Sequence, residues 1–265
     1  MINKINTFGS YLLNGKFTKL LAFSLALIFS FNVGAQDAAE VPAVSGEVAY
    51  ILNTFLFLVC GFLVMFMAAG FCMLEAGQVR SKNTAVICLK NIGLFSIAGF
   101  MYYLVGYNLM YDGVDGGYIG SFSMFDRSSE VDLETGYAAA SDWYFQMVFV
   151  ATTASIVSGA LAERILIWPF FLFTAILTAF IYPIAGSWQW GGGWLSEMGF
   201  SDFAGSTLVH SVGGYAALAG AILLGARDGK YSADGKVNVI GGCSLPMTTL
   251  GVFILWLGWF GFNGG

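Results

Sequence analysis

The chain has 265 residues, of which 57% are hydrophobic and only 10% are charged. A soluble domain is typically about a quarter charged, so this composition excludes a water-soluble globular protein. The formal net charge is −5, and the stretch GARDGKYSADGKVN is a hydrophilic turn that indicates no nucleic-acid partner. Several continuous apolar stretches reach the roughly 20 residues needed to cross a bilayer, without the alternation of barrel strands. We therefore predict an all-α, polytopic membrane protein in a lipid bilayer.

The N-terminus resembles a secretory signal. Lys4, Lys16 and Lys19 precede the apolar run LLAFSLALIFSFNV, and the small residues of Val33-Gly34-Ala35 stand before Gln36. This pattern predicts a signal peptide over residues 1–35 that is cleaved, leaving a mature chain of 36–265. The alternative is an uncleaved first helix, but the run is short for a membrane span.

Apolar stretches predict helices over 48–75, 85–110, 141–162, 165–187 and 203–226, with a sixth that begins near 245 and still runs where the sequence ends. Every second turn between them is basic, and the residues within or flanking these turns include Arg80, Lys82, Lys90, Arg164, Arg227, Lys230 and Lys236. The alternate ends are acidic and contain Asp112, Asp115, Asp126, Glu130, Asp132, Glu134, Asp142, Glu197 and Asp202. Positive loops stay in the cytoplasm, so we expect a multi-pass protein of the inner (cytoplasmic) membrane with its mature N-terminus outside. The loop 111–140 is then a surface excursion, and the chain is expected to be part of a longer protein.

His210 is the single histidine of the chain and lies in the fifth predicted helix. At about 100° per residue it shares a face with small residues, which allow another helix to approach closely. That face contains Phe203, Ser206, Thr207, Gly213, Gly214, Ala217, Ala221 and Gly225. An ionisable group inside a membrane is a functional candidate by default, whereas a neutral imidazole bonded to a neighbouring helix would be purely structural. The pattern alone leaves both readings open.

A second face, on the third predicted helix, carries Phe145, Gln146 and Phe149. Aromatic faces attract cations, although a pair of phenylalanines is more often ordinary core. Trp190 and Trp194 in the WGGGW loop fit an outer aromatic belt. Asp202 is placed as the N-cap of the fifth helix.

The other reactive residue types indicate no catalysis. The cysteines Cys60, Cys72, Cys88 and Cys243 form no CxxC pair and are expected to be packing residues. Glu163 and Arg164 look like a charge pair that marks a cytoplasmic helix end. A lone histidine provides neither a metal site nor a nucleophile–base set, so we expect no enzyme, no metal and no cofactor.

Taken together, these segments resemble the ammonium transporter (Amt) family of the Amt/Mep/Rh superfamily. The matching stretches are EAGQVRSKNTAVICLKN, FQMVFVATTASIVSGALAERI, WQWGGGWL, DFAGSTLVHSVGGYAALAGAILLGAR and GWFGFNGG. The resemblance implies a fold of eleven helices with two inverted five-helix repeats, assembled as a homotrimer with one pore per subunit. This chain would supply helices one to six, ending within the sixth.

The resemblance also implies roles for individual residues. Trp190 and Phe149 match an aromatic cage that recruits ammonium at the outer face, with Phe145 and Gln146 lining the same vestibule. Asp202 matches the acidic residue that organises this recruitment site from behind. Phe149 and Phe262 match the pore gate, and His210 matches the first of two pore histidines. The second histidine and a hydroxyl of the cage would lie beyond Gly265.

The implied function is transport of ammonium or ammonia, in which ammonium loses its proton and ammonia crosses a histidine-lined apolar pore. Two alternatives stay open: an ammonium sensor with an added output domain, and an Rh-like channel for ammonia or carbon dioxide gas. The resemblance further implies a PII-type regulatory protein as a partner of the cytoplasmic tail.

Overall fold

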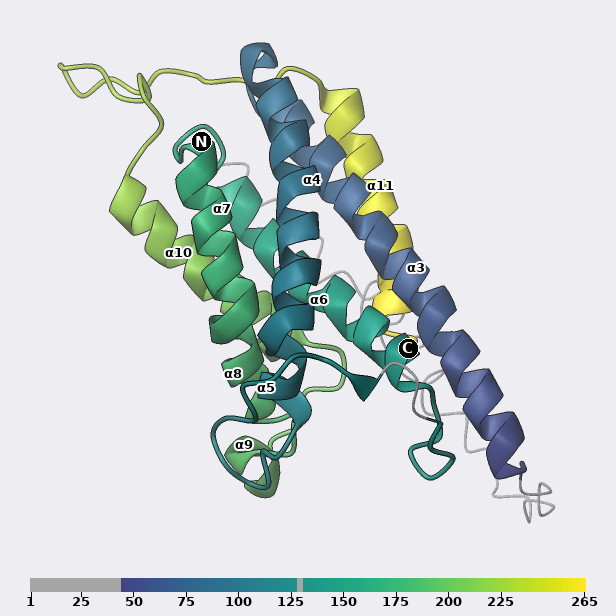
Figure 1. Ribbon diagram of the computed structural model, residues 1–265. Coiled ribbons are helices and arrows are strands. Elements are labelled where there is room, and N and C mark those ends of the chain that lie inside the picture. Colours follow the sequence, from purple (N-terminus) through teal and green to yellow (C-terminus); the bar gives the residue numbers. More distant parts are fainter. Residues whose placement is uncertain (1–43, 128–130) are drawn as a thin grey trace, which may run out of the picture. The chain divides into compact units, whose positions relative to one another are not determined.

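The computed structural model describes residues 44–127 and 131–265 (Figure 1). The predicted signal peptide, 1–35, lies outside the described residues and stays a prediction. Five helical segments are long and apolar enough to cross a membrane: Gly46–Gln78, Ser81–Tyr111, Ile167–Ser187, Ser206–Leu224 and Leu245–Phe262. Together with a sixth helix, Ala139–Ala160, they match the six predicted spans. The described residues contain no β-strand beyond one isolated bridge, so the all-α prediction is confirmed.

Helix α11 (Leu245–Phe262) lies side by side with the C-terminal half of helix α3 (Gly46–Gln78) (Figure 1). Each begins at a serine, Ser45 or Ser244, whose hydroxyl accepts a backbone N–H of the first turn. Glycines allow the close approach, since a Cβ at Gly70 would lie 2.9 Å from the backbone nitrogen of Leu255. The pair forms a rigid wall on one side of the site.

Two spans contain a widened turn. Helix α4 (Thr84–Met101) continues through a π-helical turn (Tyr102–Gly106) into α5 (Tyr107–Tyr111). Helix α7 (Ile167–Ile176) continues through a second π turn (Leu177–Ile181) into α8 (Tyr182–Ser187). Pro183 at the start of α8 lacks a backbone N–H, which favours a local change of hydrogen-bond register. The two π turns pack against each other.

Helix α6 (Ala139–Ala160) is the most buried of the long helices and packs against α3, α4 and α10. Its hydroxyl groups would be costly in lipid. Thr152, Thr153 and Ser155 each donate to the carbonyl four residues earlier, at 2.8–3.2 Å. A helix with these polar positions is stable at this depth because protein rather than lipid surrounds it.

The fifth predicted helix differs from expectation at its start. Regular structure begins at Ser206 with a π-helical segment, Ser206–Ser211, followed by α10 (Val212–Leu224), so the predicted start at 203 is wrong. Gly205 has φ +85°, a conformation that favours glycine and ends the preceding loop. The wider winding also changes the predicted face, because Leu208 is buried and Phe203 is exposed. A short helix, α9 (Trp194–Glu197), lies in the loop before this segment.

The basic turns converge on one acidic side chain. Glu163 has a fully buried side chain and forms ion pairs with Arg80 (3.0 Å) and Arg227 (3.2 Å). The expected pairing of Glu163 with Arg164 is therefore wrong: Arg164 instead donates to the carbonyl of Gly225 at 2.7 Å. Burial by itself would raise the pKa of Glu163, but hydrogen bonds from Asn83 and Arg80 outweigh it and hold the pKa below its ordinary value. Ion pairs with Glu163 therefore join the basic turns at this end of the bundle.

Candidate functional site

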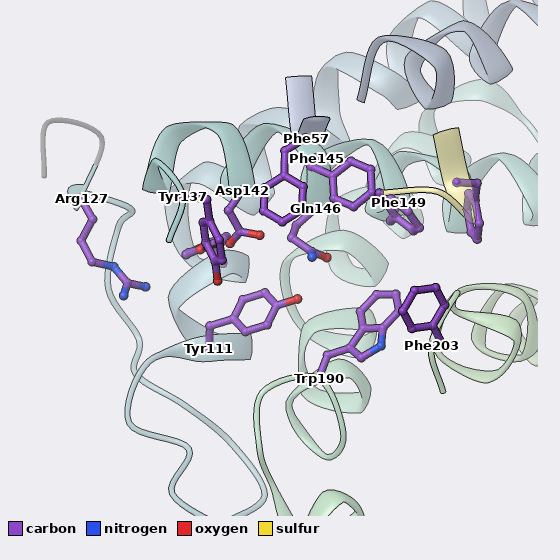
Figure 2. A pocket seen from close by; sticks show the side chains of 13 residues that line it. Phe57, Tyr111, Arg127, Tyr137, Asp142, Phe145, Gln146, Phe149, Trp190 and Phe203 are labelled. Atoms are coloured by element: carbon purple, nitrogen blue, oxygen red, sulfur yellow. Dashed lines mark hydrogen bonds between the residues drawn. The ribbon is translucent and has the colours of Figure 1, made fainter. Parts of the chain in front are cut away.

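A cavity of about 460 Å³ opens at the other end of the bundle, between α5, α6 and the loop before α9 (Figure 2). Its walls are mainly aromatic, with a few polar groups among them. The lining residues are Phe57, Tyr107, Tyr111, Arg127, Tyr137, Asp142, Phe145, Gln146, Phe149, Trp190, Phe203, Phe262 and Gly265. The structure therefore brings together Trp190, Phe149, Phe145, Gln146 and Phe262 as predicted neighbours.

A series of ring contacts leads inward from the cavity. Trp190 lies edge-on to Phe149 with ring centroids 5.9 Å apart, and Phe149 lies 4.2 Å from Phe262. Phe262 in turn lies 5.4 Å from the imidazole of His210. Phe145 lies 4.8 Å from Phe149 in a T-shaped contact. The four rings from Trp190 to His210 thus form a continuous path from the cavity to the bundle interior.

Asp202 positions Trp190 without lining the cavity. Its carboxylate accepts four backbone N–H groups at 2.8–3.0 Å, from Gly205, Ser206, Thr207 and Leu208. Its backbone carbonyl accepts the indole N–H of Trp190 at 2.6 Å. The predicted cap is present, and it satisfies the orphan amides of a helix start. Asp202 acts on the site through the Trp190 ring and not by direct contact with the cavity.

His210 is half-buried at the end of the π-helical segment. Its Nδ1 lies 3.4 Å from the carbonyl oxygen of Gly205, and its ring also faces Trp259, with centroids 6.3 Å apart. A ring nitrogen bonded to a carbonyl carries the proton, so the other nitrogen is an acceptor in the neutral form.

Three features of the cavity were missed by sequence reasoning. Asp142, one helical turn before Gln146 on α6, was counted only as a charge that marks the outer end, although the spacing places both on one face. Tyr107 and Tyr111 come from the end of the second span, and no pattern in the sequence links them to α6. Tyr107 donates a hydrogen bond to Asp142.

The loop 111–140 is more than the predicted surface excursion. Its Phe125 is buried and stacks on Trp143 with centroids 5.9 Å apart. Arg127 and Tyr137 line the cavity. Burial raises the pKa of Tyr137, so this phenol remains neutral at physiological pH. The prediction of a mere surface excursion is wrong, because Phe125 packs against Tyr107 of α5 and Trp143 of α6.

The chemistry of this arrangement suits a small cation. Ring faces attract positive charge, and the carboxylate of Asp142 and the amide oxygen of Gln146 accept hydrogen bonds. The Gln146 oxygen is buried and has no hydrogen-bond partner within the described part of the chain. Among the described residues, no group of three or more histidine, cysteine, aspartate or glutamate side chains could hold a metal ion.

Comparison with known proteins gives the family. The family model described as Ammonium Transporter Family matches residues 55–265. The chain belongs to the Ammonium Transporter Family. It is 46% identical over 242 residues to ammonium transporter Amt2 of Archaeoglobus fulgidus, covering 88% of this chain and 50% of that protein.

Two solved structures are similar in fold as well. A structure titled Sensor Amt Protein has a TM-score of 0.77 and 40% identity over 83% of this chain and 56% of its own. The crystal structure of Candida albicans Mep2 has a TM-score of 0.71 and 29% identity over 83% of this chain and 50% of its own. The chain spans about half the length of the curated relatives it matches.

Family membership settles the coarse predictions. The resemblance is confirmed, and so is the class of multi-pass helical membrane protein. The family is named for transport, in agreement with the expectation that the protein is not an enzyme.

Proposed function

We propose that the full-length protein transports ammonium across the cytoplasmic membrane, and that the cavity at Trp190 is its outer recruitment site. The observation that carries the proposal is the continuous path of rings from Trp190 through Phe149 and Phe262 to His210. The name of the Archaeoglobus relative supports the same substrate. We favour transport over the sensing and gas-channel alternatives for this reason.

Recruitment rests on two kinds of contact. A cation between the Trp190 and Phe149 rings gains about 1–2 kcal/mol from the ring quadrupoles when partly desolvated. Ammonium and potassium have similar radii, but only ammonium donates hydrogen bonds. The amide oxygen of Gln146 lies in the same cavity without a partner among the described residues, and it can accept a hydrogen bond from ammonium that potassium cannot donate.

Beyond the cage the path is closed by Phe149 and Phe262 and is apolar, so a full charge there is expensive. We propose that ammonium releases its proton to solvent water in the outer cavity at this point and that ammonia passes the gate. His210 then exchanges hydrogen bonds with ammonia, with a second histidine from the rest of the protein completing the pore.

The location, assembly and regulation of the protein are proposed from its resemblance to the ammonium transporter family. Residues 1–35 form a cleaved signal peptide, and the transporter domain begins at residue 36 with its N-terminus outside the inner membrane. The full-length protein is a homotrimer, and a PII-type protein regulates it from the cytoplasm.

Replacing Trp190 tests the recruitment site. In cells without their own ammonium transporters, Trp190→Leu in the full-length protein should raise the KM for ammonium uptake about tenfold, because the cation–π contact is lost. Trp194→Leu is the matched control, since Trp194 packs on Trp188 and Tyr118 and does not line the cavity. An unchanged KM in the Trp190 variant, or an equal rise in both at equal membrane expression, would refute the assignment.

A further inference from the structure

Four carboxyl groups are buried in the described part of the chain, and three of them have an ion pair or several hydrogen-bond donors. Glu75 pairs with Lys90 at 3.0 Å, and Glu163 pairs with two arginines. Asp202 accepts four backbone N–H groups. A buried carboxylate is expected to have a cation or several donors, because removing the charge from water is expensive.

Asp142 is the exception. It is 7% exposed, and it accepts a hydrogen bond from the neutral hydroxyl of Tyr107. No ion pair joins it to any described lysine or arginine. The nearest basic side chain, Arg127, instead lies over the ring of Tyr107, 5.5 Å from its centroid. The carboxylate is therefore buried with no cation at ion-pair distance in the described chain. Arg127 lines the same cavity and acts on Asp142 only through its longer-range charge.

The position of Asp142 indicates which cation can form an ion pair with it. Asp142 lines the same cavity as Trp190 and Phe149, with Gln146 between it and the rings (Figure 2). Asp142 and Gln146 are four residues apart on α6 and therefore lie on one face of the helix. The cavity wall thus passes from a carboxylate to an amide oxygen and then to the aromatic cage.

We propose that Asp142 is a cation-binding residue of the outer cavity, which holds ammonium before it moves to the Trp190–Phe149 cage. This inference rests on the proposed function. Two of the four N–H groups of ammonium can donate to the Asp142 carboxylate and to the Gln146 oxygen. Its charge supplies the close ion pair that no described lysine or arginine makes with Asp142. The site serves capture more than discrimination, since a carboxylate attracts potassium as well.

The charge of Asp142 is tested by an isosteric pair of variants in the full-length protein. Asp142→Asn keeps the shape and the acceptor for Tyr107 but removes the charge, while Asp142→Glu keeps the charge. We expect Asp142→Asn to raise the KM for ammonium uptake about five- to twentyfold, the size expected for one unit charge lost from a partly desolvated site. The maximal rate should stay within about twofold, because the gate and His210 are untouched. Asp142→Glu should retain most of the affinity.

The outcomes separate this inference from the proposed function. If the unmodified protein shows no ammonium uptake, the proposed function fails. If it transports ammonium but Asp142→Asn has an unchanged KM, the capture site is wrong while the transport function stands. An equal loss in Asp142→Glu and Asp142→Asn would also overturn it, because charge would then not be the cause. Thermal unfolding of each purified variant shows whether a loss reflects misfolding.

Discussion

Glu75 and Glu163 at one end of the bundle and Asp142 at the other are buried acids in opposite environments. At the end where the basic turns meet, Glu75 and Glu163 are each paired with cations of the chain. At the cavity end, Asp142 has a phenol for a partner, and the Gln146 oxygen has none within the described residues. Paired charges fasten helices together, whereas unpaired ones cost stability unless a ligand joins them. We therefore regard Glu75 and Glu163 as structural residues and propose ligand binding at Asp142.

Further contacts surround the ion pair between Glu75 and Lys90. Ser158 on α6 donates to Glu75 at 2.8 Å, and Lys90 donates to the carbonyl of Ser158 at 2.8 Å. Lys90 also lies over the ring of Phe170, 5.2 Å from its centroid. This cluster joins α3, α4, α6 and α7 inside the bundle, so its removal should affect folding before function.

Breaking the buried pair is the largest expected effect. Lys90→Met leaves the Glu75 carboxylate without a cation and should lower the free energy of unfolding by about 3–5 kcal/mol. The measurement is thermal or denaturant unfolding of the full-length transporter in detergent. The double variant Glu75→Gln/Lys90→Met should regain most of the loss, because neither charge then remains buried. A double variant as unstable as Lys90→Met alone would show that packing, not charge, is the cause.

A smaller effect is expected at Glu163, because Arg80 and Arg227 are about a third exposed. Glu163→Gln should cost about 1–3 kcal/mol at neutral pH. The pKa of Glu163 is lower in the folded protein, so its contribution is present above the ordinary value and is lost as pH falls through the folded pKa. The wild type should therefore lose more stability than Glu163→Gln on acidification below about pH 4.5.

Lys82→Gln is the control for that measurement, as Lys82 lies in the same turn and forms no ion pair with a described residue. Its stability should change by less than about 0.5 kcal/mol. Parallel pH curves for wild type and Glu163→Gln would contradict the role of Glu163.

The sequence predicted the six spans and one face of α6 for physical reasons, whereas only the family resemblance placed Trp190 beside that face. Apolar length is set by the bilayer, and the face of Phe145, Gln146 and Phe149 follows from helical spacing. The π-helical start at Ser206 was not predictable, because it depends on the hydrogen bonds that four backbone N–H groups donate to the Asp202 carboxylate. The sequence also placed Asp142 among the acidic residues of the outer ends. It did not predict that Asp142 is buried, because this burial depends on contacts with α5.

The loop was misjudged for a related reason. Acidic and glycine-rich segments predict solvent exposure, yet Phe125 within them packs on Trp143 and Tyr107. Only tertiary packing between distant segments reveals that such a loop supplies cavity residues.

The contrast between the two ends is tested most directly by the same chemical change at each, carboxylate to amide, in the full-length transporter. Both the KM for ammonium uptake and the unfolding temperature are measured for Glu75→Gln and Asp142→Asn. We expect Glu75→Gln to lower the unfolding temperature with little change in KM. We expect Asp142→Asn to raise the KM while the unfolding temperature stays the same or rises, since a buried, unpaired charge is removed. A fall in stability with an unchanged KM for Asp142→Asn would contradict the account.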